Sequence, residues 1–195
     1  MDEPALRALW ESGDRQAFVT AVIQTYGREI LSYLIATLRG EGEAGDAFSQ
    51  FSLNLWQASA AFRGTSSART WAYALARHAV GRTYRERTRA RRQVPLSGVP
   101  EVDAAAARVR SDTLQYLRTE TRDRVSQLRD ELEPDDQTIL ILRVDRGFTW
   151  PEIARVMGEM GDGEAPSDKE IAALRKRFER IKDRLRKKAL ALGQT

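Results

Sequence analysis

Residues 147–188 read GFTWPEIARVMGEMGDGEAPSDKEIAALRKRFERIKDRLRKK. Thr149 is followed three residues later by Glu152, a capping-box pattern that predicts the start of a short helix. The pattern recurs at Ser167, where it predicts the start of a longer helix. A short capped helix, a turn and a second helix are typical of a helix-turn-helix, whose second helix enters the major groove of DNA.

The longer helix of this pair has an apolar face and a basic face. Its apolar residues at helical spacing are Ile171, Leu174, Phe178, Ile181 and Leu185. The cations that this spacing leaves for phosphates or bases are Lys169, Arg175, Lys176, Arg177, Arg180 and Lys182. The turn before the helix, residues 158–166, is longer than the usual length of about 3–4 residues. This long turn either displaces the second helix, which would read the DNA, or forms a flap. The alternative function of the basic helix is to bind a protein partner.

The composition is that of a soluble globular chain. It has 195 residues, 42% hydrophobic and 31% charged, which suits one domain or two small ones. No apolar run approaches the roughly 18 residues of a membrane-spanning helix, and the acidic start does not resemble a signal peptide. We therefore expect a cytoplasmic protein without membrane insertion. With no Cys and one His, we expect no thiol catalysis, no disulfide, no metal site and no cofactor.

Positive charge is concentrated in two blocks. Residues 82–92 carry six Arg against one Glu, and residues 175–188 carry nine Lys and Arg against two acids. The net charge is only +4 because the rest is acidic: residues 93–174 hold 17 acids and 10 bases. Two basic blocks on an acidic chain indicate two footprints on a polyanion, with nucleic acid as the leading candidate. The alternative is that both blocks are solvated helix faces without a ligand.

Helical patterns also fill the first half. Apolar residues recur every four positions from Phe18 to Leu38, and further apolar stripes begin at Phe48 and Trp71. Residues 93–107 contain two Pro and one Gly, which predicts a linker, with a helix that starts at its Ala run as the alternative for its end. We expect an all-α fold of two small helical domains joined by a linker, the second domain being the helix-turn-helix. The expected boundaries are residues 1–92 for the first domain, 93–111 for the linker and 112–195 for the second domain.

Three motifs follow one another in the first half: an acidic-then-apolar helix, an F-x-G loop and a T-W-x-Y-x-x-A-R helix. Their residues are Asp46, Gln50 and Trp56, then Phe62, Arg63 and Gly64, then Thr70, Trp71, Tyr73, Ala76 and Arg77. In this order they resemble region 2 of the bacterial extracytoplasmic-function (ECF) sigma factors of the sigma-70 family. Residues 142–154, LRVDRGFTWPEIA, resemble region 4 of the same family. The sequence departs from the family at His78, where Asn is usual, and at the long turn 159–166.

The resemblance implies a promoter-specificity subunit of RNA polymerase and not an enzyme. The residues that it assigns to the β′ clamp helices of core polymerase are Asp46, Gln50, Asn54 and Trp56. Those that it assigns to the −10 element of promoter DNA are Phe62, Arg63, Gly64, Thr65, Ser66, Ser67, Arg69, Arg77, His78, Arg82 and Arg85. Those that it assigns to the −35 element are Lys169, Arg175, Lys176, Arg177 and Arg180. The β flap of the polymerase and an anti-sigma factor are further partners that the family implies.

The −10 assignment also has a chemical basis. Capture of a flipped base needs backbone and hydroxyl groups that bond its edge, which residues 64–67 supply. The arginines that follow at helical spacing form a basic track for a single strand, beside which His78 or Tyr84 can stack or donate hydrogen bonds. Trp71 shares the face of Leu75, so we expect it in the core and not under a base.

Three other functions would make different demands on the sequence. The runner-up is a stand-alone helix-turn-helix regulator, which would bind duplex operator DNA without polymerase. An enzyme such as a nuclease would need paired acids beside Lys or His, whereas the carboxylates here are scattered over helix faces. An all-helical adaptor that binds only protein would show no salt-dependent binding of DNA.

Overall fold

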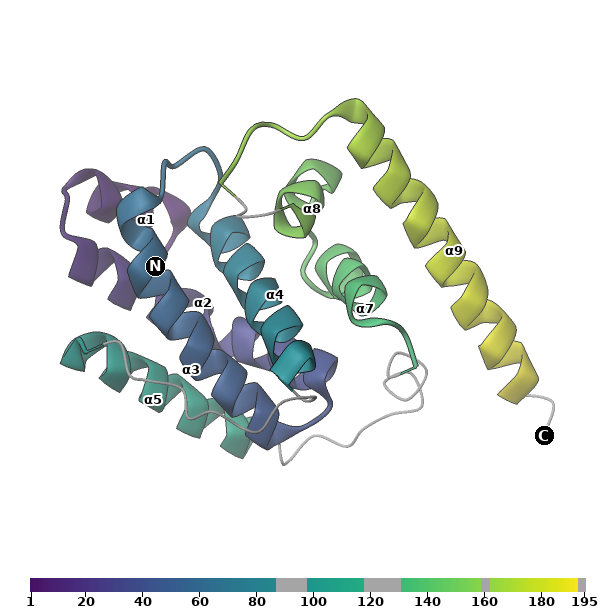
Figure 1. Cartoon of the computed structure of the whole chain (residues 1–195), viewed down its shortest axis with the longest axis horizontal. Helices are drawn as coiled ribbons and strands as arrows, with labels where there is room; N and C mark the ends of the chain where they lie inside the picture. Colours follow the sequence, from purple (N-terminus) through teal and green to yellow (C-terminus); the bar gives the residue numbers. More distant parts are fainter. Residues whose placement is uncertain (87–97, 118–130, 159–161, 193–195) are drawn as a thin grey trace.

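The computed structural model describes residues 1–86, 98–117, 131–158 and 162–192, and every regular element in these ranges is helical (Figure 1). The first half contains α1 (Glu3–Glu11), α2 (Arg15–Leu38), α3 (Glu41–Ala58), the 3-10 turn η1 (Ser59–Ala61) and α4 (Ala68–Glu86). The rest contains α5 (Pro100–Leu117), α7 (Pro134–Leu140), the π-helical turn η2 (Ile141–Asp145), α8 (Trp150–Met157) and α9 (Asp168–Leu192). The predicted all-α fold is confirmed. None of the helices that the structure describes combines the length and the apolar character of a membrane-spanning segment.

The core of the first half lies where α2, α3 and α4 pack together. The apolar stripe predicted from Phe18 to Leu38 is buried along α2, and its two end residues are each 1% exposed. Trp71 of α4 is also 1% exposed, with its ring centroid 4.5 Å from that of Phe62 and 6.1 Å from that of Phe18. Aromatic pairs of this kind contribute about 0.5–1.5 kcal/mol beyond the burial of their surface. Trp71 is therefore a core residue, as predicted.

Polar caps set where the last two helices begin. The backbone N–H of Thr149 donates to Glu152 Oε2 at 2.7 Å, and the capping box at the start of α8 is complete. The backbone N–H of Ser167 donates to Glu170 Oε2 at 2.8 Å at the start of α9. The hydrogen bonds from Ser167 hold the pKa of the Glu170 carboxyl below its usual value. Both predicted capping boxes are confirmed, so the helices expected for a helix-turn-helix begin where the sequence indicates.

Residues 100–111, expected to belong to a linker, form most of helix α5 instead. This helix packs against α2 and α3, and its Val102 is fully buried. Gly27 of α2 permits the close approach, because a Cβ there would lie 3.0 Å from Val109 Cγ1. An alanine-rich run opened by a proline has a high helix propensity, which explains why these residues are helical. Residues 93–97 of the expected linker lie outside the described part of the chain.

Helices α7, α8 and α9, here called the second half, pack on the first half, which consists of α1 to α4. Helix α8 lies against α4, and α7 lies against α2. The rings of Tyr73 in α4 and Phe148 meet edge to face, with centroids 5.1 Å apart. The side-chain amide of Gln137 donates to the backbone oxygen of Ala36 at 2.8 Å. Helix α9 packs on α7 and α8 and runs along one side of the molecule, away from α5 (Figure 1). The second half therefore covers part of the helix that carries the expected −10 arginines.

Candidate nucleic-acid interface

The loop expected to bind the −10 element lies between η1 and α4. Phe62 anchors it, being 8% exposed, and meets the Trp10 ring edge to face at a centroid distance of 5.5 Å. Gly64 has a φ of 66°, and a Cβ there would lie 2.7 Å from Trp10 Cζ3, so only glycine fits against this ring. The loop ends at Ser67, whose hydroxyl accepts from the N–H of Thr70 at 3.0 Å and caps α4. Local packing thus fixes the loop from both ends.

A pocket of about 450 Å³ opens beside this loop. Its walls include the aromatic side chains of Trp10, Phe18 and Phe62 and the hydroxyl-bearing Thr65 and Ser66. The volume lies within the range of small-molecule sites, about 300–1,000 Å³. Aromatic faces next to hydrogen-bonding groups are the combination that unstacked bases use. The loop and its pocket are therefore chemically suited to hold a nucleobase.

The donors of the loop already have a partner in the second half of the chain. The N–H of Thr65 donates to Asp162 Oδ1 at 2.9 Å, and the Thr65 hydroxyl donates to the same oxygen at 2.5 Å. The N–H of Arg63 donates to Asp162 Oδ2, and the Arg63 guanidinium donates to the backbone oxygen of Asp162 at 2.6 Å. Three expected site groups thus converge on one carboxylate.

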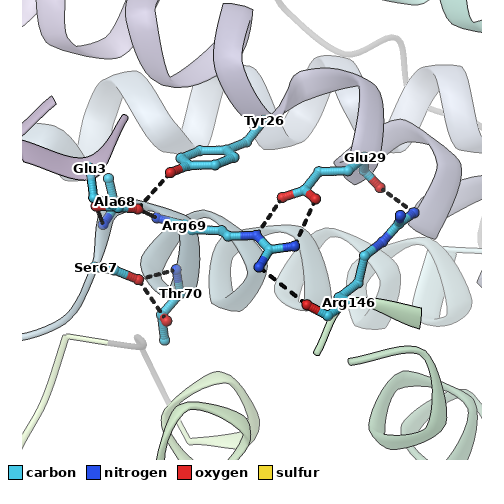
Figure 2. A network of polar contacts seen from close by, with 8 residues as sticks. All are labelled: Glu3, Tyr26, Glu29, Ser67, Ala68, Arg69, Thr70 and Arg146. Atoms are coloured by element: carbon cyan, nitrogen blue, oxygen red, sulfur yellow. Dashed lines mark hydrogen bonds and ion pairs between the residues drawn. The ribbon is translucent and has the colours of Figure 1, made fainter. Parts of the chain in front are cut away.

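Glu3 of α1 holds the first turn of α4, as Figure 2 shows. Its carboxylate accepts from the N–H groups of Ala68 and Arg69, at 3.0 and 2.9 Å. The Tyr26 hydroxyl also donates to it, at 2.7 Å. Burial, followed by the hydrogen bond to Glu3, raises the pKa of Tyr26. An acidic side chain at a helix N-terminus is favoured by the helix dipole, so Glu3 stabilises the helix that carries the expected −10 arginines.

Arg69 is tied into the structure and is not free to follow a DNA strand. Its guanidinium donates to both oxygens of Glu29, at 2.8 and 2.9 Å, and to the backbone oxygen of Arg146 at 3.2 Å (Figure 2). It also lies 4.6 Å from the centroid of the Phe148 ring. The hydrogen bond that Arg69 donates to Glu29 is the main cause that raises the pKa of Arg69. The basic track expected from the sequence is therefore shorter than its helical spacing suggests.

The remaining arginines of the track divide between α7 and the surface of α4 itself. Arg77 Nε lies 3.2 Å from Asp135 Oδ1, with side chains 22% and 45% exposed. Arg82 Nε lies 2.7 Å from Glu86 Oε1 within α4. A second pocket, of about 590 Å³, lies between these elements, and its lining includes Arg77, His78, Tyr84, Arg85, Asp135 and Arg177. His78 is half-buried there and Arg85 is exposed. The structure therefore brings the distal part of the track together, but opposite acidic side chains.

The residues assigned to core polymerase differ in their accessibility. Asp46 on α3 is exposed, and Trp56 is half-buried beneath the Arg15 guanidinium, 4.3 Å from the ring centroid. Gln50, expected on the exposed polar stripe, is only 5% exposed and donates to Asn54 Oδ1 at 2.7 Å. Helix α3 packs against α2, α4 and α5, so only a narrow part of its surface faces solvent. Only part of the expected stripe is available to a partner in this structure.

The cations assigned to the −35 element divide into two groups. Lys169, Arg175, Lys176 and Arg180 are exposed on α9. Arg177, expected to be free for DNA, is half-buried, and its Nε lies 2.6 Å from Asp136 Oδ1 of α7. Asp136 is 7% exposed, and its Oδ2 also pairs with Arg184 Nη1 at 3.4 Å. Arg177 therefore fixes α9 to α7, which helical spacing alone could not reveal.

Two side chains that matter for this surface escaped the sequence analysis. Asp162 was part of the long turn, and the only sign of its importance was the departure of that turn from the family pattern. Glu3 was part of the acidic start of the chain, and its contact with α4 depends on residues more than 60 positions away. Both act through pairings between distant segments, which no local pattern encodes.

Comparison with known proteins agrees with this architecture. Residues 22–90 match the family described as Sigma-70 region 2. The chain is 30% identical over 159 residues to the RNA polymerase sigma-H factor of Pseudomonas aeruginosa, covering 75% of this chain and 78% of that protein. It is 28% identical over 134 residues to the RNA polymerase sigma factor YlaC of Bacillus subtilis, covering 68% and 75%. No solved structure matches the chain. The chain therefore belongs to the sigma-70 family of RNA polymerase sigma factors, as a member of the ECF type.

Proposed function

We propose that residues 62–67 and the adjoining pocket capture a base flipped out of the non-template strand of the −10 element. The observation that carries this proposal is the convergence of the Arg63 and Thr65 N–H groups and the Thr65 hydroxyl on one acceptor. Donors arranged in this way can equally bond the oxygen or ring nitrogen of a base edge. The half-buried Trp10 in the pocket wall beside them offers a stacking surface. Such capture helps to open the promoter, because a base held outside the duplex cannot pair again.

The second half would bind the −35 element through α9. Its exposed cations, Lys169, Arg175, Lys176 and Arg180, lie on the helix that a helix-turn-helix places in the major groove. Arginine supports both bidentate contacts to guanine and contacts to phosphate. We exclude Arg177 from this set because its pairing with Asp136 is intramolecular. Each phosphate that the set neutralises would contribute about −0.9 to the slope of log affinity against log salt.

The exposed part of α3 would dock on core polymerase. Sigma factors bind core RNA polymerase and promoter DNA. Among the residues expected to bind the β′ clamp helices, Asp46 is exposed, and Asn54 and Trp56 are half-buried. On this proposal residues 1–92 carry the polymerase and −10 contacts. Residues 112–195 carry the −35 contacts and meet the β flap. The protein would act in the cytoplasm as a non-catalytic subunit, with an anti-sigma factor as a further partner.

A stand-alone DNA-binding regulator is the second candidate. The exposed cations on α9 favour it, because they could bind duplex DNA without polymerase. Such a regulator would use no unpaired bases, so its loop at 62–67 would be dispensable. The two candidates therefore differ in whether core polymerase and that loop are both required.

Run-off transcription from a library of promoters separates the two candidates. Bacterial core polymerase is supplied with or without this protein, and the templates that yield transcripts are sequenced. We expect a defined promoter class whose transcription needs the protein and is reduced by Asp46→Ala, with the exposed Gln57→Ala on the same helix as the matched control. Specific binding of duplex DNA by the protein alone, without any transcript from core polymerase, would favour the stand-alone regulator.

A further inference from the structure

One acidic side chain joins the turn between α8 and α9 to the 62–67 loop. Asp162 is 5% exposed, whereas its neighbour Glu164 in the same turn is exposed. The Asp162 carboxylate accepts from the backbone N–H groups of Arg63 and Thr65 and from the Thr65 hydroxyl. A carboxylate buried to this extent is stable only because these donors replace its water. The contact is therefore a specific fit and not a chance approach of two loops.

The turn that carries Asp162 is also fastened to α8. Arg155 of α8 donates from Nη1 to the backbone oxygen of Gly163 at 3.2 Å. The Arg63 guanidinium donates to the backbone oxygen of Asp162 itself, at 2.6 Å. Because these bonds run both to α8 and to the loop, Asp162 would leave the loop together with α8 if the second half moved away.

The groups that bind Asp162 are the same groups that a flipped base would need, so the loop cannot hold both. We propose that Asp162 is an autoinhibitory latch: it occupies the base-capturing loop in the free protein and must be displaced before −10 bases can bind. This inference rests on the proposed function of the loop. It gives the long turn, which departs from the family pattern, a role in restraining the protein outside the polymerase complex.

Contacts beside the latch cover two further residues of the expected −10 surface, Arg69 and Arg77. Asp135 of α7 pairs with Arg77 at 3.2 Å, and the backbone oxygen of Arg146 accepts from Arg69 at 3.2 Å. The Arg77 and Asp135 side chains are 22% and 45% exposed, and partly exposed ion pairs are weak and weaken further with salt. Contacts of this kind permit reversible release. Movement of the second half would free the loop and Arg77 together, whereas Arg69 would keep its bonds to Glu29.

Binding of single-stranded DNA by the free protein tests the latch. The probe is a fluorescein-labelled 15-nucleotide DNA pool of randomised sequence, and affinity is read by fluorescence anisotropy. An apparent affinity is reduced by the fraction of molecules that are closed, so a minor open population of about 10% or less predicts a gain of roughly tenfold or more for Asp162→Ala. Asp162→Asn, which keeps the shape and one acceptor, should give a smaller gain. Glu164→Ala removes the same charge from the same turn and should leave the affinity at the wild-type value.

The outcomes separate the latch from the proposed function. A gain in Asp162→Ala that disappears when Thr65→Val is added supports the latch. An equal gain in Glu164→Ala, or no gain in Asp162→Ala and Asp162→Asn while the wild type still initiates transcription with core polymerase, overturns the latch alone. If the wild type neither initiates with core polymerase nor binds the pool in any variant, the proposed function and the latch fail together.

A second measurement tests the latch without DNA, by the distance between α3 and α9. The chain has no Cys, so Gln57→Cys on α3 and Leu190→Cys on α9 can carry a pair of dyes for energy transfer. In the free protein, Asp162→Ala should lower the energy transfer relative to the Glu164→Ala control. Energy transfer that is unchanged by Asp162→Ala would show that the other contacts hold the second half in place; if the variant also showed no gain in DNA affinity, the latch would be overturned.

Discussion

The hydroxyl oxygens of Tyr33 in α2 and Thr138 in α7 lie 2.9 Å apart in a buried hydrogen bond, although 105 positions separate the two residues in the chain. Each of these residues is 1% exposed. The two halves of the chain therefore share a buried interface in this structure and are not two separate bodies joined only by a linker. The contacts in this interface must break before the second half can move away and expose the −10 surface.

Burial at this boundary predicts that alkaline pH destabilises the protein. Burial raises the pKa of Tyr33 to about 12, and it also raises the pKa of Tyr26 and Tyr73. Below pH 10 these phenols are neutral in both the folded and the unfolded state. As the pH rises above 10, the unfolded state ionises first, so the free energy of unfolding falls, by up to about 1.4 kcal/mol per pH unit for a fully buried tyrosine.

The measurement is absorbance of phenolate near 295 nm together with helical circular dichroism, both followed from pH 8 to 13. We expect part of the phenolate signal to appear only when the helices unfold. Ionisation of all five tyrosines near pH 10 with the helices intact would contradict the burial described here.

Arg69→Ala should destabilise the fold by about 2 kcal/mol. The reason is that the substitution removes charge-assisted hydrogen bonds to Glu29. The side chains of Arg69 and Glu29 are 31% and 21% exposed, so water replaces these bonds only in part. Arg82→Ala is the matched control: its pair with Glu86 is 44% and 39% exposed, so its loss should change stability by less than about 1 kcal/mol. Urea unfolding followed by circular dichroism gives both values. Equal effects of the two substitutions would mean that Arg69 is a surface cation after all.

Arg175→Ala and Arg177→Ala should separate DNA contact from structure on α9. Arg175 is exposed, so its loss should weaken duplex binding at the −35 element and lower the salt slope by about one unit without changing stability. Arg177 pairs with the 7% exposed Asp136, so its loss should destabilise the packing of α9 on α7. Salt-dependent DNA titrations and thermal unfolding of the two variants test this division. A salt slope that falls only in Arg177→Ala would reverse the assignment.

Gly64→Ala should distort the −10 loop more than its backbone angle alone explains. Gly13 and Gly64 both have positive φ, of 77° and 66°, and alanine at such an angle costs about 1–2 kcal/mol. A Cβ at Gly13 meets nothing within 4 Å, whereas one at Gly64 would lie 2.7 Å from Trp10. Thermal unfolding should therefore show a larger loss for Gly64→Ala, and intrinsic Trp fluorescence should change only in that variant. Identical behaviour of the two variants would show that Trp10 does not pack on the loop.

Local patterns predicted what depends on neighbours in sequence. The capping boxes at Thr149 and Ser167, and the place of Trp71 in the core, depend on spacings of a few residues and are confirmed. The −10 role of residues 62–67 comes from the resemblance to region 2 and stays a prediction. The domain division, the helix-turn-helix and the roles of the site residues stay predictions.

What the sequence could not indicate depends on distant segments. Gln50 is buried because α3 packs against several other helices, and Arg177 is paired because α7 brings Asp136 to it. The contact of Asp162 with the loop at residues 63–65 spans about 100 positions of sequence. Such pairings follow from the packing of helices, which periodicity within one helix does not determine.

Permanganate footprinting of the open complex tests the central claim most directly. Core polymerase, the protein and the strongest promoter from the run-off library are combined, and unpaired thymines in the −10 region are mapped. If residues 62–67 capture an unpaired base, wild-type protein gives reactive thymines there, and Thr65→Val reduces their reactivity while polymerase binding is retained. Reactivity that is the same for both proteins, or no reactivity with the wild type although transcripts form, would contradict the claim that this loop holds the promoter open.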